Sequence, residues 1–182
     1  MGILLSISRV IDRATAFIGR SVTWLILLSV LVSSGNAISR KTWSLSSNAW
    51  LDLQWYLFAG AFLLAAAYTL QRNEHIRIDI ISNLLPKTVR NWIDIFGHVV
   101  MLLPFMILII KEATPWFGQS YRIGETSSNY GGLIQWPAKG LIILGFFLLA
   151  IQAISELIKR VAVILELIPD PYDTPDPTAP IE

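Results

Sequence analysis

The residues of this chain that could carry out chemistry are few, and histidine is the most informative of them. There are two histidines, His75 and His98, and no cysteine. Without cysteine the chain can form neither a disulfide nor a thiolate site for zinc or an iron–sulfur cluster. His98 lies roughly two helical turns inside an apolar stretch, where a histidine can act as a haem ligand or a proton relay.

Two interpretations of His98 remain open at this point. It is either a neutral histidine hydrogen-bonded to a neighbouring helix or a cofactor ligand in the membrane anchor of a haem- or quinone-linked redox enzyme. His75 lies in a polar segment outside the apolar stretches, so the two histidines are poorly placed to hold one iron between them. The redox anchor is therefore the alternative hypothesis, and a Soret absorption band in the purified protein would decide it.

Four apolar stretches must position whatever chemistry there is. We expect membrane spans at about residues 20–40, 50–70, 92–114 and 134–158. A span needs roughly 17–25 mostly apolar residues, and in lipid each one must satisfy its backbone hydrogen bonds internally, as a helix. The sequence thus predicts an all-α integral membrane protein, with one four-helix domain at 1–165 and a disordered, proline-rich and acidic tail at 166–182.

The composition supports this class and argues against others. Hydrophobic residues make up 54% of the chain and charged residues 15%, whereas soluble domains carry roughly 25% charged residues. The net charge of +1 argues against bulk electrostatic binding of nucleic acid. Four spans with short connections leave no room for a separate soluble catalytic domain, so we expect no enzyme activity.

Two short interfacial helices are expected beside the spans. In the first, Ile3, Ile7, Val10 and Phe17 share one face of an amphipathic N-terminal helix, which would lie in the membrane interface before the chain enters the membrane at Arg20. No basic stretch precedes its apolar residues, as a signal peptide would require. The second is expected between spans two and three. Its apolar face would consist of Ile80, Ile81, Leu84 and Leu85.

Two features of the spans predict how they pack. Pro104 predicts a kink in span three. Small residues at three- and four-residue spacing allow close helix contact in lipid, and they serve either internal packing or docking against another membrane subunit. They include Ser29, Ser33, Gly35, Gly60, Ala61, Ala67, Gly140 and Gly145.

Basic residues favour a cytoplasmic location for both termini. With that orientation nine lysines and arginines lie on the cytoplasmic side and five on the other, in agreement with the positive-inside rule. Tryptophans mark both predicted interfaces, as aromatic belts do. They are Trp43, Trp50, Trp116 and Trp136 on the outer side and Trp92 on the inner side.

A polar motif follows span two and comprises Arg72, His75, Asp79, Pro86 and Arg90. In one interpretation its charges set the orientation of the chain, and Asp79 caps the interfacial helix. In the other, Asp79 and His75 tie that helix to the span ends or to a partner protein. The sequence leaves both open.

The outer loop at residues 115–137 carries three further candidate contact residues, Arg122, Glu125 and Trp136. Its aromatic residues anchor span ends in the headgroup region, or the loop also contacts a periplasmic partner. No residue of the chain is expected to bind a substrate or a metal.

These motifs resemble the small membrane subunit of TRAP (tripartite ATP-independent periplasmic) transporters, the DctQ-like family. The four spans, the amphipathic N-terminal arm and the cytoplasmic ends also match, over about residues 5–165. The residues that carry the resemblance are Arg72, His75-Ile76, Ile78-Asp79, Leu85-Pro86 and Arg90, with Glu125-Thr126-Ser127, Gly132-Leu133 and Trp136-Pro137 in the outer loop.

The resemblance implies one part of a three-part secondary transporter in the bacterial inner membrane. A periplasmic binding protein would deliver an organic acid, and a large permease subunit would carry the substrate and sodium sites for symport. The small subunit would be non-catalytic, hold no cofactor and scaffold the large one. The tryptophan-rich run at 48–56 resembles a subgroup linked to the uptake of 2-oxo acids or related carboxylates.

Overall fold

The computed structural model describes residues 2–45, 47–73 and 87–169, and this part of the chain is almost entirely helical. The elements are α1 (Gly2–Trp43), α2 (Asn48–Gln71), α4 (Lys87–Phe96), the π-helix η1 (Gly97–Leu102), α5 (Leu103–Ile123) and α6 (Trp136–Ile164). Four helical stretches are long and apolar enough to cross a membrane, and α4, η1 and α5 together supply one of them. The prediction of an all-α protein with four such helices is confirmed.

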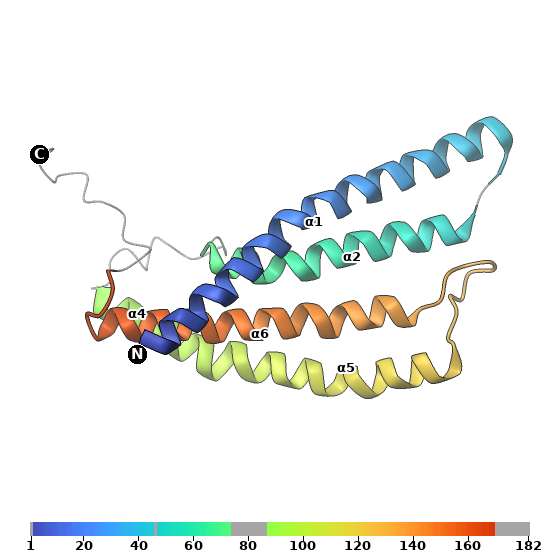
Figure 1. Cartoon of the computed structure of the whole chain (residues 1–182). Helices are drawn as coiled ribbons and strands as arrows, with labels where there is room; N and C mark the ends of the chain where they lie inside the picture. The colour runs from blue at the N-terminus through green and yellow to red at the C-terminus, as the bar shows by residue number, and fades with distance from the viewer. Residues whose placement is uncertain (1, 46, 74–86, 170–182) are drawn as a thin grey trace, which may run out of the picture.

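The helices form a row rather than a closed bundle (Figure 1). In the row α1 packs against α2, α2 against α6, and α6 against α5, while α1 also crosses α6. The start of α1 and the end of α6 lie at one end of the row, which we call the N-terminal end. The loop 124–135 lies at the other, the hairpin end. Because α5 packs mainly on α6, the row stays open over much of both faces, and α1 covers one of them only where it crosses α6.

The buried core is correspondingly thin. Within the described residues the buried apolar side chains are Val22, Met106 and five alanines, whereas many large apolar side chains are exposed. An open row of helices cannot bury more. Its exposed apolar surface must be covered by lipid or by another membrane protein.

One face of α1 makes all its contacts with the neighbouring helices. Its buried residues are Ser8, Thr15, Val22 and Ser29, spaced by seven. This heptad spacing keeps the same face toward a partner helix over a long contact. The small side chains allow close approach, and the Ser29 hydroxyl donates a hydrogen bond to the Gln54 carbonyl oxygen of α2 at 3.2 Å.

Glycines set the closest contact between α2 and α6. A Cβ atom on Gly145 would lie 2.7 Å from Leu63 Cβ and 3.0 Å from the Leu63 carbonyl oxygen. The backbones of the two helices therefore touch here. Nothing lies within 4 Å of a Cβ built on Gly35, so the small residues divide between internal packing and an open surface.

The N-terminal arm differs from expectation in its boundary. We expected a separate interfacial helix that ends near Arg20, but α1 continues without a break for 42 residues, about 63 Å at 1.5 Å per residue. Nothing near Arg20 ends a helix, and Gly19 is fitted against the ring of Tyr68. Ile3 and Phe17 of the expected apolar face are exposed, and Ser8 and Thr15 pack inward. The location of the apolar face in the membrane interface stays a prediction.

A kink is predicted at Pro104, and the structure has a π-helix directly before this position. The segment η1 directly precedes α5, where Pro104 occupies the first turn. Proline lacks the N–H that an α-helical ladder requires, and a π-helical stretch absorbs such a defect. Farther along, α5 passes through Pro115 and ends at Gly124, whose φ of 61° closes the helix. The helix thus extends beyond the expected end of span three near residue 114.

Two expected elements lie outside the described residues: the second interfacial helix at residues 80–85 and most of the acidic tail, residues 170–182. Both stay predictions.

Replacing Gly145 with alanine should weaken the contact between α2 and α6, because the added methyl group meets the Leu63 backbone. Overpacking of this kind costs about 1–3 kcal/mol. The free energy of unfolding, measured on the purified chain by SDS titration in mixed micelles, should fall accordingly. Gly118→Ala in α5 is the matched control, since nothing lies within 4 Å of its added Cβ. Equal stabilities of the two variants would contradict close packing at Leu63.

Candidate functional site

The buried polar side chains of the described residues gather at the two ends of the row. At the N-terminal end they form a group that we call the arm cluster: Ser8 and Asp12 of α1, and Gln152, Ser155, Glu156 and Lys159 of α6. At the hairpin end the buried Asp52 of α2 and Lys139 of α6, with the more exposed Glu125, Ser127 and Asn129, form the hairpin cluster.

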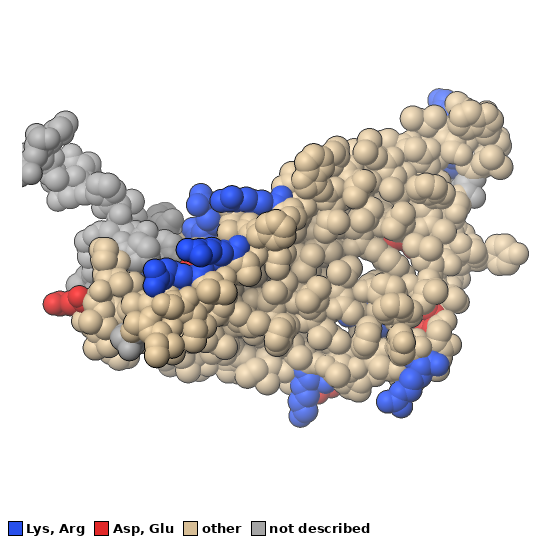
Figure 2. All heavy atoms as spheres, viewed as in Figure 1, with Lys and Arg blue, Asp and Glu red and all other residues tan. Residues whose placement is uncertain are grey.

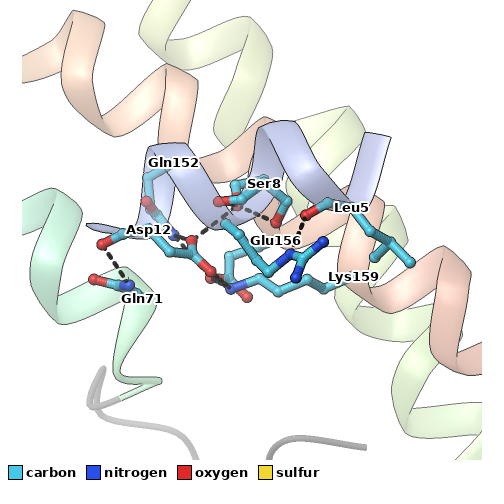
Figure 3. A network of polar contacts seen from close by, with 9 residues as sticks. Leu5, Ser8, Asp12, Gln71, Gln152, Glu156 and Lys159 are labelled. Carbon is cyan, nitrogen blue, oxygen red and sulfur yellow. Dashed lines mark hydrogen bonds and ion pairs between the residues drawn. The ribbon is translucent and has the colours of Figure 1, made fainter. Parts of the chain in front are cut away.

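Asp12 is the centre of the arm cluster (Figure 3). One carboxylate oxygen accepts hydrogen bonds from Gln152 Nε2 at 2.8 Å and from the Ser155 hydroxyl at 2.9 Å. The other oxygen lies 3.0 Å from Lys159 Nζ. The backbone carbonyl of Asp12 accepts a further bond from Gln71 Nε2 at 2.9 Å. A single residue of α1 therefore holds both α6 and the end of α2.

Glu156 is a second carboxylate of the arm cluster and shares Lys159 with Asp12. It accepts hydrogen bonds from Lys159 at 2.6 Å and from Gln152 at 3.0 Å, and the hydroxyls of Ser8 and Ser155 lie 2.7 Å apart. Gln152 and Ser155 are fully buried. Isolated charges and polar groups at such positions would cost several kcal/mol. The cluster is therefore stable only when α1, α2 and α6 are assembled in this register.

A second set of contacts ties α4 to α6 at the same end. The Arg160 guanidinium donates to Asn91 Oδ1 at 3.1 Å and pairs with the Asp94 carboxylate at 3.0 Å. Arg160 and Asn91 are both buried. Ion pairs and hydrogen bonds therefore join α1, α2, α4 and α6 at the N-terminal end of the row.

His98 lies in η1, and its Nδ1–H donates a hydrogen bond to the Asp94 carbonyl oxygen at 2.7 Å. Of the two interpretations, the structure shows a hydrogen-bonded histidine, but its partner belongs to the same helical stretch and not to a neighbouring one. Nε2 is buried without a hydrogen-bond partner among the described residues. The described residues contain no group of three or more His, Asp or Glu side chains that could hold a metal ion.

The hairpin cluster pins the loop 124–135 onto α2. Asp52 accepts hydrogen bonds from the Leu133 N–H at 2.9 Å and from Asn129 Nδ2 at 3.3 Å. Backbone bonds close the hairpin, from the Ser127 N–H to the Leu133 carbonyl and from the Gln135 N–H to the Glu125 carbonyl, both at 2.8 Å. Gly132 is in contact with Asp52 and Ser127, and any side chain there would collide with them. These contacts hold the loop in one conformation against α2.

An ion pair attaches the base of the hairpin to α6. Glu125 accepts a hydrogen bond from the buried Lys139, and Lys139 Nζ also lies 4.2 Å from the ring centroid of Trp116, within cation–π range. The Lys139 ammonium, which donates a hydrogen bond to the carboxylate, holds the pKa of Glu125 below its ordinary value of 4.5.

The structure places the predicted site residues unevenly. Arg72 is the C-cap of α2 and is exposed, and Arg90 lies in α4. His75, Asp79 and Pro86 lie outside the described residues, so both interpretations of their motif stay predictions.

The three candidate residues of the outer loop have separate environments. Arg122 is exposed in the last turn of α5. Glu125 is held by Lys139. Trp136 packs edge-on against Tyr121 and Phe117, with ring centroids 5.4 and 6.3 Å away.

Sequence analysis missed the residues that hold the helices together, above all Asp12 and Asp52. A usable signal was present for the arm cluster. Its α6 members occupy positions i, i+3, i+4 and i+7 and so share one helical face, an arrangement that marks a polar contact in an otherwise apolar helix. They are Gln152, Ser155, Glu156 and Lys159. For Asp52 no local pattern was available, because its partners lie 77 and 81 residues away in the chain.

Four helices long and apolar enough to cross a membrane, with their buried charges paired near the helix ends, define a multi-pass helical membrane protein. Residues 29–163 match the family of tripartite ATP-independent periplasmic transporters, DctQ component. This match covers well over half of the chain, which therefore belongs to the DctQ family and is a component of a TRAP transporter. Neither the comparison with curated proteins nor that with solved structures gives a match.

Replacing Asp12 with alanine should loosen the arm, because Gln152 and Ser155 lose their acceptor and Lys159 loses one carboxylate. Hydrogen bonds to charged groups contribute about 1.5–3 kcal/mol, and we expect a loss of about 2 kcal/mol in unfolding free energy. Limited trypsin digestion at Arg13 should become faster in the variant. Glu112→Ala, at an exposed acid of α5, is the control. Unchanged digestion at Arg13 would contradict a locking role for Asp12.

The attachment of the hairpin should depend on pH. Because the pKa of Glu125 is lowered in the folded chain, the stabilising contribution of its ion pair is present above the ordinary value of 4.5 and is lost as the pH falls through the lowered value. The melting temperature of wild type should therefore exceed that of Glu125→Gln at neutral pH. The difference should close in acid. A difference that is the same at both ends of this range would show that the ion pair is not its cause.

Proposed function

We propose that this chain is the non-catalytic small permease subunit of its transporter. It scaffolds a large permease subunit that carries out sodium-coupled uptake of an organic acid, and a periplasmic binding protein delivers that acid. Membership of the DctQ family supports the place of the chain in a tripartite system. The scaffold role is supported by one observation above all, the open row of helices.

An open row leaves apolar surface for a partner along its length. Large side chains on α2, η1 and α5 are exposed, and they include Phe58, Phe62, Met101, Phe105 and Ile107. One face of such a row can contact lipid while the other is covered by a larger membrane protein. Helix association in lipid proceeds through shape and small residues, and Gly35 offers open surface of this kind.

A transport pathway through this chain itself is poorly supported. Transporters build their sites near the midplane from broken helices and polar groups. In the described part of the chain α1, α2 and α6 are continuous. The buried charges there are occupied in contacts between helices or with the hairpin. Those groups stabilise the subunit and are not available to carry ions.

The orientation that follows from the basic residues places both termini in the cytoplasm and the hairpin end in the periplasm. The hairpin would then face the loaded binding protein. At its tip Tyr130 is 98% exposed, and its carbonyl oxygen is held by Asn48 Nδ2 at 2.9 Å. A fixed loop that presents an exposed aromatic ring, at the same end as the exposed Arg122 of α5, is suited to brief protein contacts. Glu125 is less suited, because Lys139 already holds it.

Reconstituted alone in liposomes with a sodium gradient, the chain should take up no organic acid. Uptake should require the large subunit and the binding protein together. The control is the complete set of three proteins in the same liposomes. Substrate-specific uptake by this chain alone would refute the scaffold proposal.

Changing Tyr130 to serine together with Arg122 to glutamate should slow uptake several-fold when the binding protein is limiting, because exposed contact residues mainly govern encounter. Excess binding protein should restore the rate. Ser128→Ala, a change at another exposed position of the hairpin, is the control. Transport that ignores the double change at every concentration would leave the hairpin with a purely structural role.

A further inference from the structure

The N-terminal half of α1 carries charges that neither the arm cluster nor the proposed function uses. Arg9, Arg13 and Arg20 are exposed. Their spacing of four and seven residues places them within about 40° of one another around the helix axis. Figure 2 shows basic side chains gathered over this half of α1. Within the described part of the chain none of the three has an acidic partner, and Arg9 bonds only to Ser6 and the Leu5 carbonyl of its own helix.

A strip of exposed apolar side chains runs beside this arginine row. It consists of Ile3, Val10 and Phe17, which are spaced by seven residues and are 79%, 64% and 74% exposed. On a regular helix this strip lies about 80° around the axis from the arginine row. The outward surface of the arm therefore presents cations and hydrocarbon side by side.

The arm cluster fixes which way this surface points. Ser8, Asp12 and Thr15 are on the opposite side of α1, where Ser8 and Thr15 are buried and Asp12 is bonded to α6. The helix cannot turn about its axis without breaking those bonds. The arginine row and the apolar strip are consequently held outward together.

We propose that this surface binds anionic phospholipids: Arg9, Arg13 and Arg20 contact the headgroup phosphates, and Ile3, Val10 and Phe17 enter the acyl region. Guanidinium groups form paired hydrogen bonds with phosphate oxygens, and clustered basic residues favour anionic lipid surfaces. An acidic peptide or a free phosphate would engage the charges but leave the apolar strip exposed. A chain with four membrane-crossing helices has lipid next to it throughout.

The distance that the three arginines span along α1 requires the N-terminal half of this helix to run obliquely to the membrane normal. From Arg9 to Arg20 the helix advances about 16 Å, whereas the headgroup region of one leaflet is roughly 5–8 Å thick. Three phosphate contacts are compatible only if α1 runs obliquely at this level. Figure 1 shows α1 crossing obliquely over α6 at the N-terminal end.

The test counts lipids that stay bound to the full-length chain in native mass spectrometry, after incubation in detergent with equal amounts of phosphatidylglycerol and phosphatidylcholine. Each basic residue near an anionic surface contributes roughly a five-fold preference. Changing Arg9, Arg13 and Arg20 to glutamine should therefore lower the preference for phosphatidylglycerol at least about ten-fold. Changing all three to lysine should preserve most of it, because the charge remains.

A matched variant removes three exposed basic residues at the hairpin end, with Arg40, Lys41 and Arg122 changed to glutamine. It should keep the preference. Changing Val10 and Phe17 to asparagine should lower lipid retention with the arginines intact. Helicity measured by circular dichroism should be unchanged in each variant.

An equal preference in wild type and the arginine-to-glutamine variant would overturn the proposal. So would an equal loss in the hairpin-end variant, because the effect would then be one of total charge. Displacement of the lipid by excess inorganic phosphate would identify a simple phosphate site instead. Unchanged lipid retention in the asparagine variant would show that the apolar strip takes no part in lipid binding.

Discussion

The pairing of polar groups inside the chain is the constraint on which the rest of the structure depends. Lipid offers no hydrogen-bonding partner, so a carboxylate such as Asp12 or Asp52 must find its donors on another helix or loop. Each of these two residues collects several donors from segments far away in sequence. The apolar faces alone would allow the helices to slide and rotate. The two clusters, one at each end of the row, select a single register.

The helices were predictable because hydropathy and length are local properties. The apolar stretches located all four membrane-crossing helices, and Pro104 marked the irregular turn. The continuity of α1 was not predictable in this way. The charge of Arg20 suggested that the N-terminal helix ends there, whereas Gly19 packs against Tyr68 of α2 and the helix continues. The clusters were harder still. Whether Asp52 is a surface acid or an anchor depends on a loop 77 or more residues away.

The row architecture explains why the family membership and the geometry agree. A subunit that transports on its own would have to enclose a path, and four helices in a row enclose nothing. Such a row can instead extend the surface of a larger protein, with its buried charges paired inside the chain and its apolar faces free. The contacts of α2 and α6 through Gly145 make the centre of this row rigid, while α1 and α5 form its two edges.

The thin core has a consequence for the abundance of the subunit. With Val22, Met106 and five alanines as the buried apolar side chains in the described residues, apolar burial within the chain contributes little to the folding free energy. A partner that binds only the folded form adds stability by mass action, about 2.7 kcal/mol when its concentration is a hundred times the dissociation constant. Copies made in excess of that partner lack this contribution and are open to proteolysis for a larger fraction of the time.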